Sequence, residues 1–245
     1  MNIPELVTRK FLRSSDQPIT APLYEIVIAQ NGVFKRACRM EMTASVELSS
    51  FAVKIPELAV GAAFARLTEK IPAEVFAGIL THARDSTDAF NFTENLYAVC
   101  RNNETGGYFW KEVSRRRSFG STIAHDDDPA YQTAVLEIHT HPPGCLDFSS
   151  QDDRDESGKF RLFGILVDIH SAKPMIRLRV GVYDSFWEIA VEEVADAPLE
   201  NLTDLVAQER ELLVELCQNF NNDFNDSLLA AEYRIAVDSR LSETL

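Results

Sequence analysis

The sequence has few cysteines and no long apolar run. Its four cysteines, Cys38, Cys100, Cys145 and Cys217, lie far apart in the 245 residues, and no two of them form a CxxC pair. The N-terminal residues MNIPELVTRKFLRSS contain no apolar stretch of the kind found in secretory signals. Together these features favour reduced thiols in a cytoplasmic protein. No run approaches the roughly 18 apolar residues of a transmembrane helix, so we expect no membrane partner.

Positive charge is also scarce. Lys and Arg number 24 against 38 Asp and Glu, which gives a formal net charge of −14. An acidic chain repels nucleic acids and anionic membranes, so we expect neither as a principal partner. Otherwise the composition is that of an ordinary globular protein, with 45% hydrophobic and 25% charged residues, which excludes collagen-like and wholly disordered classes.

The N-terminal part predicts an extension made of an arm and a β-hairpin, over residues 1–49. Residues 1 to about 20 are polar and are expected to form a loose arm. Residues 23–30, LYEIVIAQ, alternate in polarity and are followed by Asn31-Gly32 and a second run of strand-forming residues. Asn-Gly between two such runs is a strong hairpin signal. Residues 43–54 are expected to add one or two short strands.

The middle of the chain, residues 50–197, predicts an α+β domain with a mixed sheet flanked by helices. Val60, Phe64, Leu67 and Ile71 recur at helical spacing, which predicts a helix over 57–71 that ends at Pro72. The apolar run 75–80 is expected to be a buried strand. Further strands are expected at 90–99, 108–113, 133–141, 163–169, 175–182 and 186–191, with a second helix at 150–161. Runs of strands separated by isolated helices are typical of this class.

The composition changes at Pro198, after which apolar residues follow at helical spacing. Residues 198–245 are therefore expected to form a helical extension, with a long amphipathic helix, an interruption at NNDFND, and a further helix over 227–237. This extension could cover the domain or form an oligomer, and the pattern alone does not distinguish the two.

The densest chemical signal is the segment 139–152, HTHPPGCLDFSSQD. Residues i and i+2 of a strand project from the same face, so His139 and His141 can present two imidazoles side by side. The chain then turns through Pro142–Gly144 and enters a helix in whose first turn Asp152 lies. Two imidazoles and one carboxylate leave a fourth position open on Zn²⁺, which is the mark of a catalytic rather than a structural zinc site.

Each part of this pattern also has an ordinary structural explanation. A single HxH pair is more often a surface or satisfied pair than a pair of ligands. Ser149-x-x-Asp152 resembles a capping box, which begins a helix without any metal. The combination is nevertheless rare, because two histidines with Ser and Asp at these offsets would occur by chance in roughly one in two thousand such chains. The cap and the ligand role are compatible, since a cap would fix the turn that aims Asp152.

The complete pattern resembles the signature of the JAMM (JAB1/MPN/Mov34) metalloproteases, in which HxHP is followed by a Ser and then an Asp at these spacings. In this chain the pattern is His139, His141, Ser149 and Asp152. Members of the family also carry a Glu upstream, where the first helix gives way to the first strand, often in text similar to P-x-E-x-x-x-G-x-L. The segment 72–80, PAEVFAGIL, matches that text and identifies Glu74 as the candidate. The resemblance covers residues 50–195 and implies a JAMM/MPN-type, cytidine-deaminase-like mixed sheet.

What the resemblance implies is a zinc-dependent peptidase or isopeptidase. Zinc would be held by His139, His141 and Asp152 and would carry the attacking water. Glu74 would be the general base, and Ser149 would help to stabilise the tetrahedral oxyanion. Glu137, two residues before His139 on the same face of the expected strand, competes with Glu74 for the role of base. Cys145 could instead place a thiolate at the open position of zinc.

Within the family the chain resembles the bacterial proteins called PRTRC system protein A, which accompany an activating protein, a conjugating protein and a small ubiquitin-like protein. This implies a ubiquitin-like protein, or its conjugates, as substrate and partner. One alternative is a non-catalytic MPN-like binding or scaffold module, although such members typically lose a ligand. A metallo-β-lactamase would need an Asp at position 143, where this chain has Pro143.

Overall fold

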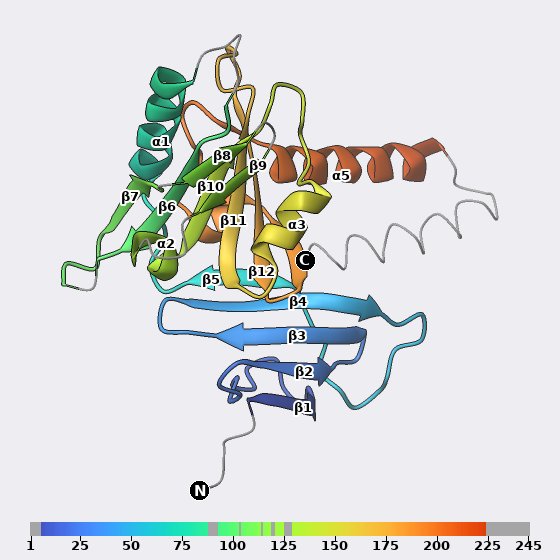
Figure 1. The fold of residues 1–245 in the computed structure, drawn as a ribbon. Coiled ribbons are helices and arrows are strands. Elements are labelled where there is room, and N and C mark those ends of the chain that lie inside the picture. Colours follow the sequence, from blue (N-terminus) through green and yellow to red (C-terminus); the bar gives the residue numbers. More distant parts are fainter. Residues whose placement is uncertain are drawn as a thin grey trace, which may run out of the picture.

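The computed structural model describes residues 6–87, 93–102, 104–113, 115–118, 121–124 and 129–223. They form an α+β fold with a five-stranded sheet near the N-terminus and a seven-stranded mixed sheet in the centre (Figure 1). No helix in these ranges is both long and apolar enough to cross a membrane. The combination of these sheets with separate helices confirms the α+β class expected from the sequence.

The N-terminal sheet has the strand order β1-β2-β3-β4-β5. Its strands are β1 (Val7–Phe11), β2 (Tyr24–Ile28), β3 (Gly32–Cys38), β4 (Met42–Ser50) and β5 (Phe64–Leu67). The hairpin predicted around Asn31-Gly32 is confirmed, because β2 and β3 pair antiparallel up to Ile28 and Val33. The expectation of a loose arm is wrong for the described part, since β1 pairs parallel with β2 along its whole length.

The helix predicted over residues 57–71 does not form. This segment instead lies along the N-terminal sheet, where the Ala59 N–H donates to the Leu12 carbonyl at 2.9 Å. Gly61 packs so closely on Phe34 that a Cβ atom would lie 2.2 Å from its ring. The segment ends in β5, which pairs with β4. The helical spacing was therefore coincidental, and Val60, assigned to the buried face, is 58% exposed.

The run predicted as a strand over residues 75–80 is helical. It belongs to α1 (Ala73–Ser86), which begins after Pro72 as its N-cap. The buried residues of α1 are Val75, Phe76, Ile79, Leu80 and Ala83, and this spacing puts them on one face of a helix. That face packs into the main hydrophobic core. The first helix of the chain is therefore α1, which begins about 15 residues after the helix expected from the sequence pattern.

The central sheet has the order β13-β12-β11-β10-β6-β7, with β14 beside β12. Its strands are β6 (Leu96–Arg101), β7 (Tyr108–Glu112), β10 (Leu136–Thr140), β11 (Phe160–Val167), β12 (Met175–Val182), β13 (Ser185–Ile189) and β14 (Thr203–Asp204). The strands predicted in this part of the chain are thus confirmed, with shifted ends. β10 pairs parallel with β11 and antiparallel with β6, so it lies in the interior of the sheet.

The remaining elements surround this sheet (Figure 1). They are the short hairpin β8 (Arg115–Ser118) and β9 (Ser121–Ala124), and the helices α2 (Pro129–Thr133), α3 (Ser150–Glu156), α4 (Val191–Val194) and α5 (Leu205–Asp223). α3 is shorter than the helix expected over 150–161, because Gly158 adopts a φ of 76° and β11 begins at Phe160. The long helix expected after Pro198 is confirmed as α5, while the helix expected at 227–237 lies outside the described residues.

The N-terminal sheet and the central sheet share one core. Residues of β3 and β4, among them Ala37, Met42 and Val46, belong to the same buried cluster as Leu136 and Leu178 of the central sheet. The boundary expected between residues 49 and 50 falls inside β4, and the same sheet continues to Leu67 in β5. The N-terminal sheet is therefore packed against the domain that carries the candidate site.

The packing of α1 can be tested through one side chain. Phe76 is 1% exposed, and Phe109 on β7 is 45% exposed. We expect Phe76→Ala to lower the free energy of unfolding by about 3–5 kcal/mol, because it removes a buried ring and leaves a cavity. Phe109→Ala is the matched control and should cost about 0.5 kcal/mol or less. Urea unfolding followed by circular dichroism measures both, and equal losses would contradict the placement of α1.

Candidate metal centre

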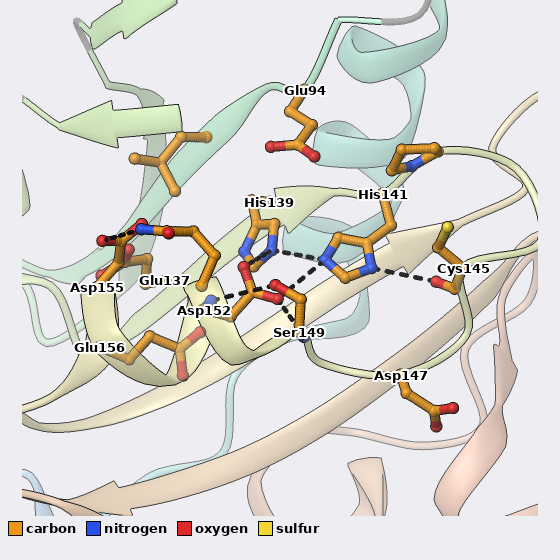
Figure 2. Close-up of a pocket in the computed structure, with 13 residues that line it drawn as sticks. Glu94, Glu137, His139, His141, Cys145, Asp147, Ser149, Asp152, Asp155 and Glu156 are labelled. Atoms are coloured by element: carbon orange, nitrogen blue, oxygen red, sulfur yellow. Dashed lines mark hydrogen bonds and ion pairs between the residues drawn. The ribbon is translucent and has the colours of Figure 1, made fainter. Parts of the chain in front are cut away.

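The strand β10 and the residue that follows it present the two histidines. His139 pairs with Ile165 of β11 and with Leu96 of β6, and the His141 N–H donates to the Leu166 carbonyl at 2.9 Å. Because both residues continue one strand direction, their imidazoles lie on one face, with Nε2 atoms 2.9 Å apart (Figure 2). The residues are 7% and 5% exposed, so both rings are buried at the end of an interior strand.

A tight connection brings the third candidate ligand, Asp152, to the histidines. Gly144 adopts a φ of +79°, a conformation that favours glycine, and its N–H donates to Asp168 Oδ1 at 2.9 Å. The chain then enters α3 through a capping box. Two reciprocal hydrogen bonds make this box. Ser149 Oγ accepts from the Asp152 N–H at 3.2 Å, and Asp152 Oδ2 accepts from the Ser149 N–H at 2.5 Å.

The cap aims the Asp152 carboxylate at both imidazoles. Asp152 Oδ1 lies 3.2 Å from His139 Nε2, and Oδ2 lies 3.4 Å from His141 Nε2. The three ligand atoms lie within 4.8 Å of one another. The predicted ligands His139, His141 and Asp152 are thus brought together, and Ser149 is beside them as the helix cap. Imidazole nitrogens and a carboxylate oxygen at this separation suit a divalent transition metal such as Zn²⁺.

The backbone of Cys145 orients one of the imidazoles. His141 Nδ1 lies 3.1 Å from the Cys145 carbonyl oxygen, which can only accept a hydrogen bond. This contact favours the tautomer of neutral His141 with hydrogen on Nδ1 and leaves the Nε2 lone pair directed at the cluster, as carbonyls that accept from metal-binding histidines do. The Cys145 residue is exposed and its sulfur is not one of the clustered ligand atoms.

The charges in the cluster shift two pKa values in opposite directions. Burial would raise the pKa of Asp152, but hydrogen bonds from His139, His141 and Ser149 outweigh it and hold that pKa well below its usual value. Burial lowers the pKa of His141, yet the hydrogen bond and charge of Asp152 raise it by more, with smaller contributions from the Cys145 carbonyl and Glu94. The metal-free cluster therefore favours a proton on His141 beside an ionised Asp152.

A glutamate that the sequence analysis did not identify faces this cluster. Glu94 precedes β6 and lines the same pocket as His139 and His141 (Figure 2). Its neighbour Asn95 is tied to the strand between the two histidines, because the Asn95 N–H donates to Thr140 Oγ1 at 2.8 Å and the Thr140 N–H donates to the Asn95 carbonyl at 2.9 Å. The chain therefore holds Glu94 opposite His141, at the point where the segment after α1 enters the first strand of the central sheet.

The buried side chain of Asn95 strengthens this placement. Asn95 is 1% exposed, and its amide donates to Ser86 Oγ at 2.6 Å and to Thr87 Oγ1 at 2.9 Å. The end of α1, the entry to β6 and Thr140 are thereby joined in one buried polar network. This network holds the backbone beside Glu94 in place.

The structure places Glu74 elsewhere. It lies in the first turn of α1 and lines a separate pocket with residues 198–202, not the pocket of His139 and His141. The assignment of Glu74 depended on a helix ending at Pro72, and the helix instead begins there. Had α1 been recognised from the spacing of Val75, Phe76, Ile79 and Leu80, the junction between helix and strand would have moved to the strand expected over 90–99, which contains Glu94.

Glu137 lines the pocket, but its carboxylate forms ion pairs with neighbouring residues of the sheet. Glu137 Oε2 accepts from Arg161 Nη1 at 3.0 Å and lies 3.5 Å from Lys159 Nζ. With its charge compensated by two cations, Glu137 is an ion-pair residue of the sheet, and Glu94 is the glutamate that faces both imidazoles in Figure 2.

Comparisons with known proteins add little to this picture. The sequence matches no protein-family profile and no curated protein. Among solved structures the chain is similar to the solution structure of protein DSY2949 from Desulfitobacterium hafniense, with 17% identity and a TM-score of 0.34. That match covers 53% of this chain and 94% of the other.

The opposed pKa shifts of Asp152 and His141 predict a pH window of stability for the metal-free protein. The contribution of Asp152, whose folded pKa is lowered, is present above its unfolded pKa of about 3.9 and is lost as the pH falls. The contribution of His141, whose folded pKa is raised, is complete below about pH 6.5 and is lost as the pH rises. The pairing should therefore stabilise the fold most between about pH 4 and 6.5.

The measurement is the free energy of unfolding of wild type and Asp152→Asn across this pH range, with a chelator present. We expect the difference between them to be largest inside the window. Asp155→Asn is the matched control on the same helix, because Asp155 Oδ1 contacts Gln151 instead of a histidine. A difference for Asp152→Asn that is constant with pH would contradict the ion pair.

Proposed function

We propose that this chain is a zinc-dependent metallopeptidase or isopeptidase of the JAMM type, which hydrolyses an amide or isopeptide bond. The observation that carries the proposal is the convergence of His139, His141 and Asp152 in a pocket that Glu94 also lines. Three ligands with a further carboxylate beside them are the minimum for a metal-assisted hydrolase, because one metal position remains for water or substrate. The proposal replaces Glu74 by Glu94 as the general base.

The donor set fits zinc. His139, His141 and Asp152 would hold the ion through two imidazole nitrogens and one carboxylate oxygen, with the carbonyl of Cys145 fixing the tautomer of His141. When bound, zinc supplies Lewis-acid polarisation of a scissile carbonyl and lowers the pKa of water toward neutrality. A proton on His141 must leave before its Nε2 can bind a metal, so the affinity for zinc should rise with pH.

The protein's own groups would handle the proton and the developing charge. A Glu94 carboxylate oxygen takes the proton of the attacking water and returns it to the nitrogen of the leaving amine. Ser149 Oγ accepts from the Asp152 N–H and lines the pocket, and its O–H is the donor proposed to turn from Asp152 to the substrate. A donor aimed at the carbonyl oxygen stabilises the charge that develops there.

The substrate class in this proposal comes from the sequence resemblance. The C-terminus of a ubiquitin-like protein, free as a precursor or joined to an amine, is the substrate that the JAMM signature and the likeness to PRTRC system protein A favour, in a bacterial cytoplasm. The competing function is a non-catalytic MPN-like binding module. The intact set of three ligands, with Ser149 and Glu94 beside it, favours the hydrolase, because a binding module has no need of a complete donor set.

Metal content is the first test of the proposed function. We expect wild type supplied with zinc to bind about one ion per chain, and His139→Ala or Asp152→Ala to bind none, because each removes one of three ligands. Asp155→Asn, a change in an exposed carboxylate three residues from Asp152, should retain the metal. Atomic absorption after gel filtration measures the stoichiometry. A folded wild type that takes up no zinc would favour the binding module.

The identity of the base is tested by a pair of substitutions. Glu94→Gln should reduce hydrolysis by more than about 100-fold, in the range expected for loss of a general base, while zinc stays bound. Glu74→Gln, the matched control in the other pocket, should hydrolyse at the wild-type rate. The assay uses a fluorogenic amide carrying the C-terminal residues of a ubiquitin-like protein, with zinc content measured in parallel. Loss of activity in Glu74→Gln alone would restore the earlier assignment.

A further inference from the structure

Arg179 of β12 lies under the segment that carries the candidate ligands. It is 5% exposed, and its guanidinium lies between two aromatic rings, 3.9 Å from the ring centre of Phe148 and 4.1 Å from that of Phe186. Phe148 directly precedes the helix cap Ser149. An arginine stacked in this way restricts the ring of Phe148 and hence the entry of the chain into α3.

The same guanidinium also binds the helix after the cap. Arg179 Nη1 lies 2.6 Å from Asp153 Oδ1, and Arg179 Nε donates to Glu156 Oε2 at 2.8 Å. Asp153 directly follows the ligand Asp152, and Glu156 is one helical turn beyond it. Arg179 therefore contacts residues on both sides of the Ser149–Asp152 capping box.

A helix as short as α3 needs such anchors. α3 has seven residues, and isolated helices of this length are not stable in water. The capping box fixes the first turn of α3. The contacts of Arg179 with Asp153 and Glu156 fix the rest of the helix on the sheet, and so they help to set the direction in which the Asp152 carboxylate points.

Phe148 provides a second connection from Arg179 to the metal cluster. The ring centres of Phe148 and His139 lie 6.5 Å apart in an edge-to-face arrangement. One guanidinium thus supports a helix that carries one ligand and a ring that contacts another. Arg177, two residues earlier on the same face of β12, donates to the Leu146 carbonyl at 2.9 Å but directs its other contacts mainly to Glu188 and Glu209.

We propose that Arg179 is a positioning residue for the zinc site, which holds Asp152 and His139 in the geometry that binds the metal. This inference rests on the proposed function, because it concerns the same three ligands. It assigns a role to a residue 27 positions beyond Asp152 that contacts none of the ligand atoms. Replacing residues that hold the ligands of a metal site, without touching the metal, commonly changes metal affinity by about 10–100-fold.

The burial of Glu156 allows Arg179 to be replaced by an uncharged residue. Glu156 is 2% exposed, and burial raises its pKa to about 8 even though the Arg179 guanidinium acts in the opposite direction. When Arg179 is replaced by a neutral residue, Glu156 can remain protonated near neutral pH. Arg179→Met is therefore expected to fold without leaving an unpaired buried charge.

The test compares Arg179→Met and Arg179→Lys with wild type in the zinc dissociation constant, measured by competition with a chromophoric chelator at 25 °C. We expect Arg179→Met to weaken zinc binding by about 10–100-fold. Arg179→Lys keeps the charge but loses the planar fork, so its loss should be smaller. The visible spectrum of the Co²⁺-substituted protein should also shift in Arg179→Met, which a purely structural role would not cause.

The matched control is Arg36→Met, which removes another buried arginine that pairs with a buried glutamate. Arg36 Nη2 lies 3.2 Å from Glu25 Oε1 in the N-terminal sheet. This variant should lose thermal stability while its zinc affinity stays within about twofold of wild type, because Arg36 and Glu25 share no contact with the candidate ligands and distant sites act independently.

The outcomes separate this inference from the proposed function. If wild type binds zinc and both Arg179 variants bind it equally well with unchanged Co²⁺ spectra, the role of Arg179 is wrong and the metal site stands. If folded wild type binds no zinc, the proposed function fails and the inference fails with it. Should Arg179→Met not fold, weakened binding in the folded Arg179→Lys supports the role, and wild-type affinity in that variant overturns it.

Discussion

The register of β10 between β6 and β11 is the constraint on which the candidate site depends. His139 pairs with Leu96 on one side and with Ile165 on the other, so the strand cannot slide without breaking hydrogen bonds on both edges. A slip of one residue would turn both imidazoles to the opposite face of the sheet. The same pairing brings Asn95 to Thr140 and places Glu94 at the pocket. The two histidines and the candidate base are thus positioned by one set of hydrogen bonds around β10.

Local rules were sufficient to predict the ligand half of the site. The alternation in His139-Thr140-His141 indicates a strand, Pro142–Gly144 ends it, and Ser149 with Asp152 begins a helix. Each of these steps involves residues close together in sequence, and the structure has the strand, the turn and the capping box in that order. The capping box also directs Asp152 as expected, because one of its carboxylate oxygens accepts from Ser149 while the other faces His139.

The base could not be predicted in the same way, because it depends on contacts between distant segments. The helical spacing in residues 57–71 is overridden by the fit of Gly61 against Phe34, 27 positions away, and by the pairing of β5 with β4. Once that helix was assumed, the junction between helix and strand moved from Glu94 to Glu74. The contacts of Arg179 with α3 could likewise not be predicted, since nothing near position 179 in the sequence indicates them. Helix propensity is a weak guide to secondary structure wherever contacts between distant residues decide the conformation.

The carboxylates of the pocket show why the environment, rather than the residue type, decides function. Glu137 and Glu94 both line it, and by sequence either could accept a proton. Arg161 and Lys159 pair with the Glu137 carboxylate, so its oxygens are directed along the sheet to two cations. Glu94 is held by the backbone of Asn95 on the side of the imidazoles, where its charge acts on His141. For the proposed function, Glu94 is therefore the candidate base on the imidazole side of the pocket, while Glu137 pairs with Arg161 and Lys159.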